Sequence, residues 1–127
     1  MKLAEYFENV KGTGVLGTAD SLGNVDLAIY AKPYVIEEDK IAFSMLNRLS
    51  YQNVCANPKA AYMFIEKREG YEGKRLYLSM IGEEKDVEAI KKLKKQHGKV
   101  YNPADDKHLV YFKVENVRAL VGDEGKS

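Results

Sequence analysis

Residues 40–64 read KIAFSMLNRLSYQNVCANPKAAYMF, and the order of elements in this stretch decides how the fold is interpreted. Its apolar ends predict strands over residues 40–45 and 60–66. The middle predicts a short helix over residues 47–57. This helix ends at Asn57-Pro58, because the residue before a proline disfavours helical backbone. One strand therefore leads almost directly into a helix, which leads back into a second strand.

The rest of the chain continues this alternation of short elements. The pattern predicts helices over residues 3–11 and 86–97, and strands over residues 14–19, 25–31, 75–81 and 108–121. Short turns such as DSLGN at residues 20–24 join most strands, and few crossover helices intervene. This favours a mainly β domain over residues 1–127, in which an antiparallel sheet closes into a barrel.

Period-two alternation is clearest in two of the predicted strands. Leu76 and Leu78 share one face of the first, and Val110 and Phe112 share one face of the second. We expect these four side chains to lie in the core of the barrel.

Composition excludes several classes of protein. The 127 residues carry 20 basic and 19 acidic side chains, a formal net charge of +1, which argues against nucleic acid as a partner. No apolar run approaches the roughly 20 residues that cross a bilayer, so no membrane span is expected. The N-terminal residues lack the apolar segment of a signal peptide, and the single cysteine permits no intrachain disulfide. We expect a cytoplasmic protein.

The turn into the helix at residues 47–57 carries the most chemical information. Ser50 is a good helix N-cap, exposed first-turn amides favour anions, and the guanidinium of Arg48 suits phosphate oxygens. The same residues also describe an ordinary capped surface helix beside a solvated arginine, and spacing alone leaves both interpretations open. Among nine tyrosines, Tyr30 and Tyr51 lie nearest this segment in the predicted elements.

Metal binding and nucleophilic catalysis have little support in the sequence. The histidines are His97 and His108, Cys55 is the single cysteine, and no H-x-x-x-H or C-x-x-C spacing occurs. We expect no metal site and a buried Cys55, and no residue stands out as a catalytic acid or base.

Four pieces of the chain together resemble the pyridoxamine 5'-phosphate oxidase-like FMN-binding split barrels. They are GVLGTADSLGNVDLAIYAKPYVI at residues 14–36, the opening stretch, GKRLYLSMIGEEKD at residues 73–86 and HLVYFKVENVRAL at residues 108–120. The resemblance implies an antiparallel, six-stranded split β-barrel with short flanking helices. It also implies a homodimer that holds FMN at the subunit interface.

The resemblance further implies which residues bind the cofactor. Along the flavin and its ribityl chain it places Tyr30, Ala31, Lys32, Phe43, Ser44 and Met45. At the phosphate it places Arg48, Ser50 and Tyr51, with Asn53 supporting the turn, and on the fifth predicted strand Arg75 and Tyr77 approach the ring. Many members carry a lysine where this chain has Ser50, so Arg48 is expected to be the main phosphate cation.

The resemblance implies an FMN-dependent oxidoreductase acting on an unidentified small-molecule substrate, with a small-molecule redox substrate or electron donor as its partner. Two alternatives stay open. The first is an FMN-binding or electron-carrier protein with no dedicated substrate, and the second is a relative that binds haem or a deazaflavin.

Overall fold

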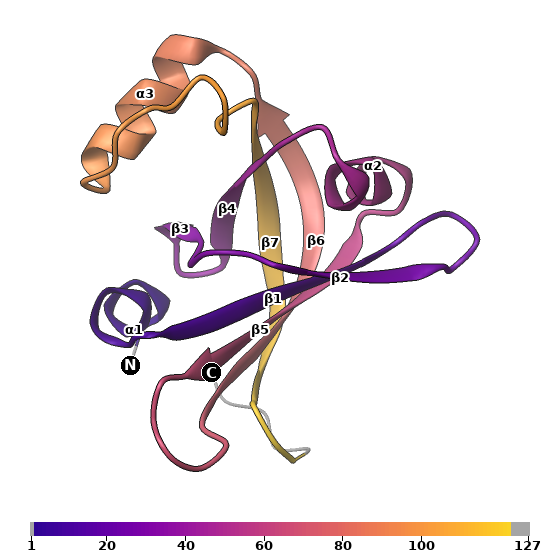
Figure 1. The fold of residues 1–127 in the computed structure, drawn as a ribbon, viewed down its shortest axis with the longest axis vertical. Coiled ribbons are helices and arrows are strands. Elements are labelled where there is room, and N and C mark those ends of the chain that lie inside the picture. Colours follow the sequence, from indigo (N-terminus) through magenta and orange to yellow (C-terminus); the bar gives the residue numbers. More distant parts are fainter. Residues whose placement is uncertain (1, 123–127) are drawn as a thin grey trace.

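The computed structural model describes residues 2–122 and shows one antiparallel sheet with three helices (Figure 1). In chain order the elements are α1 (Leu3–Asn9), β1 (Gly12–Ala19), β2 (Val25–Ile29), β3 (Tyr34–Glu37), β4 (Lys40–Met45), α2 (Leu49–Ala56), β5 (Lys59–Glu66), β6 (Gly73–Glu84), α3 (Val87–Gln96) and β7 (His108–Ala119).

The sheet has the strand order β2-β1-β5-β6-β7-β4-β3. The expected mainly β, antiparallel architecture is confirmed, but the six strands and the closure into a barrel are wrong, because the described residues form seven strands and edge strands β2 and β3 do not pair with each other. The additional strand is β3, which follows Pro33 and pairs with β4 through a register shift. Such a short, irregular edge strand carries little periodic signal, and Pro is tolerated at the start of an edge strand.

The N-terminal hairpin forms as the sequence predicts. Val15 pairs with Ile29 and Ala19 with Val25, and the Asp20 side chain accepts the amides of Leu22 and Asn24 at 2.9 Å. Strand β2 ends two residues earlier than expected, so the segment after Ile29 leaves the ladder. This early exit creates the irregular segment that borders the candidate site.

The main core takes buried side chains from β1, β4, β5, β6 and β7, and in Figure 1 β1 and β2 run across β6 and β7. Leu76, Leu78, Val110 and Phe112 are all buried there, which confirms the expected core. Helix α1 lies at the end of the sheet near the start of β1 and adds Leu3, Tyr6 and Phe7 to the same cluster.

Helices α2 and α3 lie at the other end of the sheet (Figure 1). Helix α2 is anchored to β1 by a buried hydrogen bond of 3.0 Å from Asn53 Nδ2 to Thr18 Oγ1. Helix α3 begins at Asp86, whose side chain caps the Ala89 amide at 3.0 Å, and it covers a separate small cluster that includes Ile90 and Leu109. The candidate site forms at this end of the sheet.

Candidate functional site

Arg48 stands at the start of α2, directly after the turn that leaves β4. The residue has extended backbone, and its amide donates to Leu46 O at 2.7 Å. The first helical hydrogen bond runs from Gln52 N to Arg48 O at 3.0 Å, so the amides of the first turn have no acceptor within the helix. Such amides, together with the helix dipole, favour an anionic group at this point.

The expected capping role of Ser50 is wrong. Arg48 occupies the N-cap position, no side chain caps the helix, and Ser50 is the second helical residue. The helix begins before Ser50 because the turn at residues 46–48 already directs the chain into it. The Ser50 side chain is instead buried, where it interacts with the Tyr30 hydroxyl.

Five of the twelve expected cofactor residues line one cavity of about 630 Å³. The cavity lies where the segment after β2, the end of β4 and the start of α2 meet. The expected residues that line it are Tyr30, Ala31, Ser44, Arg48 and Ser50. The sequence did not single out the others, which are Asp26, Ala28, Ile29, Leu46, Leu49 and Asp105.

Unused hydrogen-bonding groups converge on this Arg48 cavity. Among the described residues the buried Ser44 Oγ has no well-formed hydrogen bond, and no ion pair engages Arg48. Burial raises the pKa of Tyr30 despite opposing effects of Ser50 and Arg48, so this phenol is a neutral donor near pH 7. The cavity thus offers a cation and hydroxyl groups beside the apolar side chains of Ile29 and Leu46.

The neighbouring strand residues Phe43 and Met45 lie elsewhere. Both side chains are buried in the core, on the opposite side of β4 from Ser44. Phe43 packs edge-to-face against Tyr30, with ring centroids 5.7 Å apart. Phe43 therefore supports the Tyr30 wall of the cavity from behind and does not line it.

Tyr51 faces away from the cavity. Its ring stacks on His108 with centroids 4.0 Å apart, and its hydroxyl donates to Glu83 Oε1 at 2.8 Å. His108 Nδ1 lies 3.0 Å from the other oxygen of the same carboxylate. This cluster ties α2 to the ends of β6 and β7, and burial together with the Glu83 hydrogen bond raises the pKa of Tyr51.

Lys32, Arg75 and Tyr77 lie outside the Arg48 cavity. Lys32 Nζ donates to Phe7 O at 2.7 Å and borders a separate groove between α1 and the end of α3. Arg75 and Tyr77 line a hollow on the β6–β7 surface, together with Asn116 and Arg118. Within one chain, none of these three residues, which were expected along the flavin and its ring, lines the Arg48 cavity.

The sequence singled out neither Asp26 nor Asp105 as a site residue, although the acidic pair Asp105-Asp106 was visible in it. Asp105 reaches the cavity from the segment between α3 and β7, which is held by a buried ion pair. In that pair Lys94 Nζ lies 2.6 Å from Asp106 Oδ2, and the Ser44 hydroxyl lies close enough to favour the ionised form of Asp106. No local pattern signals this arrangement, because it depends on where a long connection crosses the sheet.

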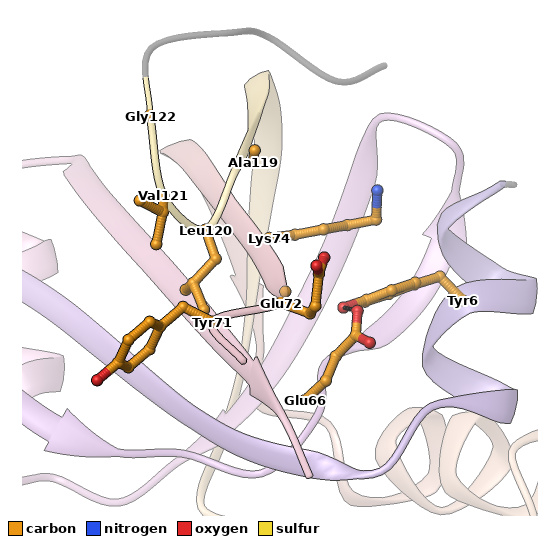
Figure 2. A pocket seen from close by; sticks show the side chains of 10 residues that line it. Tyr6, Glu66, Tyr71, Glu72, Lys74, Ala119, Leu120, Val121 and Gly122 are labelled. Carbon is orange, nitrogen blue, oxygen red and sulfur yellow. Dashed lines mark hydrogen bonds between the residues drawn. The ribbon is translucent and has the colours of Figure 1, made fainter. Parts of the chain in front are cut away.

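A second cavity of about 630 Å³ lies at the opposite end of the sheet (Figure 2). There Tyr6 and Glu66 point toward each other, and the Tyr6 hydroxyl donates to Glu66 Oε2 at 2.7 Å. Burial and this hydrogen bond raise the pKa of Tyr6. Glu66 and Glu72 make this cavity a poor site for a phosphate group.

Two further expectations concern metals and the cysteine. No group of three metal-ligating side chains occurs among residues 2–122. Cys55 is exposed, which contradicts the expected burial, because it lies on the outer side of α2. No helix in the described part of the chain is long and apolar enough to cross a membrane.

The residues at the Arg48 cavity fit the phosphate and ribityl end of a flavin mononucleotide. Arg48 and the first-turn amides suit the phosphate, and the hydroxyl of Ser44 suits a ribityl hydroxyl. The carboxylates of Asp26 and Asp105 oppose a dianion electrostatically but accept hydrogen bonds from ribityl hydroxyls.

Solved structures share this fold across nearly the whole chain. An FMN-binding protein from Syntrophomonas wolfei superposes with a TM-score of 0.79 at 17% identity, covering 97% of this chain and 86% of that chain. HupZ from Group A Streptococcus gives 0.76 at 15% identity, with 98% and 96% covered. A proposed pyridoxamine 5'-phosphate oxidase from Lactobacillus delbrueckii gives 0.69 at 16% identity, with 91% and 88% covered.

No family model and no curated protein matches the sequence. The structural likeness nevertheless confirms, at the level of the fold, the resemblance to the pyridoxamine 5'-phosphate oxidase-like proteins. The chain has their split-barrel fold, with seven strands and an open sheet.

Proposed function

We propose that this protein is an FMN-binding flavoprotein whose cofactor phosphate lies at Arg48. The observation that carries the proposal is the convergence on one cavity of the Arg48 guanidinium, which no ion pair among the described residues engages, the Ser44 hydroxyl and the first-turn amides of α2. The fold neighbours, one of which is described as FMN-binding, support the same cofactor.

FMN when bound supplies two-electron redox chemistry, and the protein positions and tunes the flavin. Arg48 and the first turn of α2 bind the phosphate, Ser44 engages the ribityl chain, and Tyr30 borders the path toward the ring. No described residue in the cavity is placed as a dedicated general acid or base. We infer an oxidoreductase that takes a small-molecule substrate or electron donor at the exposed part of the flavin.

The functional unit in this proposal is a homodimer, and β2 supplies the interface. Val25, Leu27 and Ile29 share one face of this edge strand and are 75%, 71% and 72% exposed. Three large apolar side chains in a row on an unpaired edge are unfavourable in water, and a second copy of the chain would cover them. Ile29 also lines the Arg48 cavity, so the same partner would cover the open side of the flavin.

The first test is the identity of the chromophore that copurifies with the protein. A flavin spectrum supports the proposal. A Soret band or a deazaflavin spectrum would show that the protein binds haem or a deazaflavin in place of FMN. Reduction of the bound flavin by NADH or NADPH, followed by turnover on an acceptor, separates an enzyme from an electron carrier.

The second test addresses the phosphate contact directly. Arg48→Ala should weaken FMN by about 10- to 100-fold, since a hydrogen bond to a charged group contributes roughly 1.5–3 kcal/mol and each decade of affinity is about 1.4 kcal/mol. Riboflavin, which lacks the phosphate, should be nearly unaffected by the same change. Titration of both ligands measures the difference.

Arg68→Ala is the matched control, because Arg68 is exposed on the loop after β5 at the far end of the sheet. It should leave both affinities unchanged. Equal losses of FMN and riboflavin affinity in Arg48→Ala would show that Arg48 does not contact the phosphate.

A further inference from the structure

Tyr62 is fully buried on β5, and its hydroxyl reaches two consecutive backbone carbonyls. The hydroxyl lies 3.2 Å from Tyr30 O and 3.1 Å from Ala31 O. Tyr30 and Ala31 form the segment that leaves β2 and lines the Arg48 cavity. The Tyr62 side chain in the core is thus hydrogen-bonded to the backbone of two residues that line the cavity.

This wall segment has few other backbone partners. The ladder between β1 and β2 reaches its end at Tyr30, whose amide donates to Gly14 O at 3.0 Å. The chain then turns away toward Pro33, which has no amide hydrogen to donate. The carbonyls of Tyr30 and Ala31 therefore lie beyond the regular pairing, and the Tyr62 hydroxyl partners both.

Gly14 makes this contact possible. A Cβ at this position would overlap the Tyr62 hydroxyl and the Tyr30 carbonyl oxygen, so a larger residue would push the two apart. Phe43 completes the support from the core side, with its ring centroid 5.0 Å from that of Tyr62 and 5.7 Å from that of Tyr30. Burial raises the pKa of Tyr62, so its hydroxyl remains a proton donor near neutral pH.

We propose that Tyr62 is a positioning residue, which holds residues 30–31 in place as the wall of the Arg48 cavity. The inference rests on the proposed flavin site for its functional consequence. Tyr62 itself touches no ligand, and it acts through the backbone of Tyr30 and Ala31. A core residue remote from the phosphate site therefore helps to determine how the ligand is held.

The test compares Tyr62→Phe with Tyr6→Phe. Both changes remove one phenol hydroxyl from a buried tyrosine of the same core cluster, but Tyr6 bonds Glu66 at the far end of the sheet (Figure 2). In the protein without flavin, amide hydrogen exchange should accelerate about fivefold at residues 30–32 in Tyr62→Phe. In Tyr6→Phe the exchange of these amides should stay unchanged.

Flavin titrations supply the functional measurement. Tyr62→Phe should weaken FMN and riboflavin alike, by about fivefold, because residues 30–31 border the part that the two ligands share. Tyr6→Phe should leave both affinities within twofold. Unchanged exchange at residues 30–32, or equal effects of the two variants on binding, would overturn the inference. If the unaltered protein binds no flavin, the proposed function fails while the exchange comparison still tests Tyr62.

Discussion

Two carboxylates share the Arg48 cavity with the guanidinium, which distinguishes this site from a simple cationic pocket. Asp26 lies on β2 and Asp105 on the connection before β7. Both repel a phosphate dianion, so they set a lower affinity than Arg48 alone would provide. The two carboxylates therefore make the cavity less selective for a ligand that carries a phosphate.

Asp105→Asn should tighten FMN binding by a factor of up to about five, because interactions of exposed charges contribute roughly 0.2–1 kcal/mol. The gain should shrink at high salt as screening increases. Riboflavin should bind equally well to both forms, which titrations at two salt concentrations would check. Glu115→Gln, an exposed acidic position on β7, is the control and should change neither affinity.

At the scale of elements, β2 differs most from what a half-buried strand normally shows. Its small and polar residues Asp26 and Ala28 are half-buried at the cavity, whereas its large apolar residues are largely exposed, and of these Ile29 also borders the cavity. Alternation predicted the strand, but it did not indicate which face would be covered. An exposed apolar face of this kind is explained if a second chain packs against it.

Leu27→Lys should convert the proposed homodimer into a monomer, because a charged side chain at the centre of an apolar interface would be buried without a partner. Sedimentation velocity at micromolar concentration measures the change. Val100→Lys is the control, since Val100 is 86% exposed and belongs to the connection after α3 and not to β2. A Leu27→Lys protein that remains dimeric would place the interface elsewhere.

The prediction of the fold from the sequence was least accurate in the number and pairing of the strands. The hairpin of β1 and β2 and the strand–helix–strand order around α2 were predicted, since each depends on residues close together in the chain. The four-residue strand β3 was missed, because its pairing with β4 contains a register shift and its flanks read as turns. The prediction that the sheet closes into a barrel was wrong, because closure depends on whether the edge strands β2 and β3, which lie far apart in the sheet, pair with each other.

At the scale of the whole molecule, the buried Lys94–Asp106 pair joins α3 to the connection that crosses toward β4 and β7. Asp106 also accepts the Asn102 amide at 2.7 Å. Burial alone would raise the pKa of Asp106, but the Lys94 and Asn102 hydrogen bonds outweigh it and lower that pKa. Burial alone would lower the pKa of Lys94, yet the Asp106 hydrogen bond raises it.

The pair therefore predicts how stability depends on pH. A lowered pKa means that Asp106 stabilises the fold above its ordinary value of 3.8, and that this contribution is lost as pH falls through the folded value. A raised pKa means that Lys94 contributes fully below its ordinary value of 10.5 and loses its contribution as pH rises through the folded value. The contribution of the pair should be constant between these limits.

Asp106→Asn should lower the free energy of unfolding at pH 7 by about 3 kcal/mol, because it leaves Lys94 buried without its partner. The difference from the unaltered protein should narrow as pH falls below 3.8, which denaturant unfolding at several pH values would reveal. Glu88→Gln breaks an exposed pair with Lys91 and should leave stability nearly unchanged at every pH. A constant difference down to low pH would contradict the ion-pair explanation.

Elements whose signal is local were predictable from the residues alone. Alternation located the core residues Leu76, Leu78, Val110 and Phe112, the turn after β4 pointed to Arg48 and Ser50, and the family resemblance added Ser44. Three features depend on the folded chain: Ser50 is buried beside Tyr30, Asp105 lines the cavity, and the Tyr62 hydroxyl reaches the segment after β2. They could not be predicted because periodicity reports only which face a residue takes within its own element. The neighbour across that face is set by the pairing of strands far apart in the chain, such as β4 with β7.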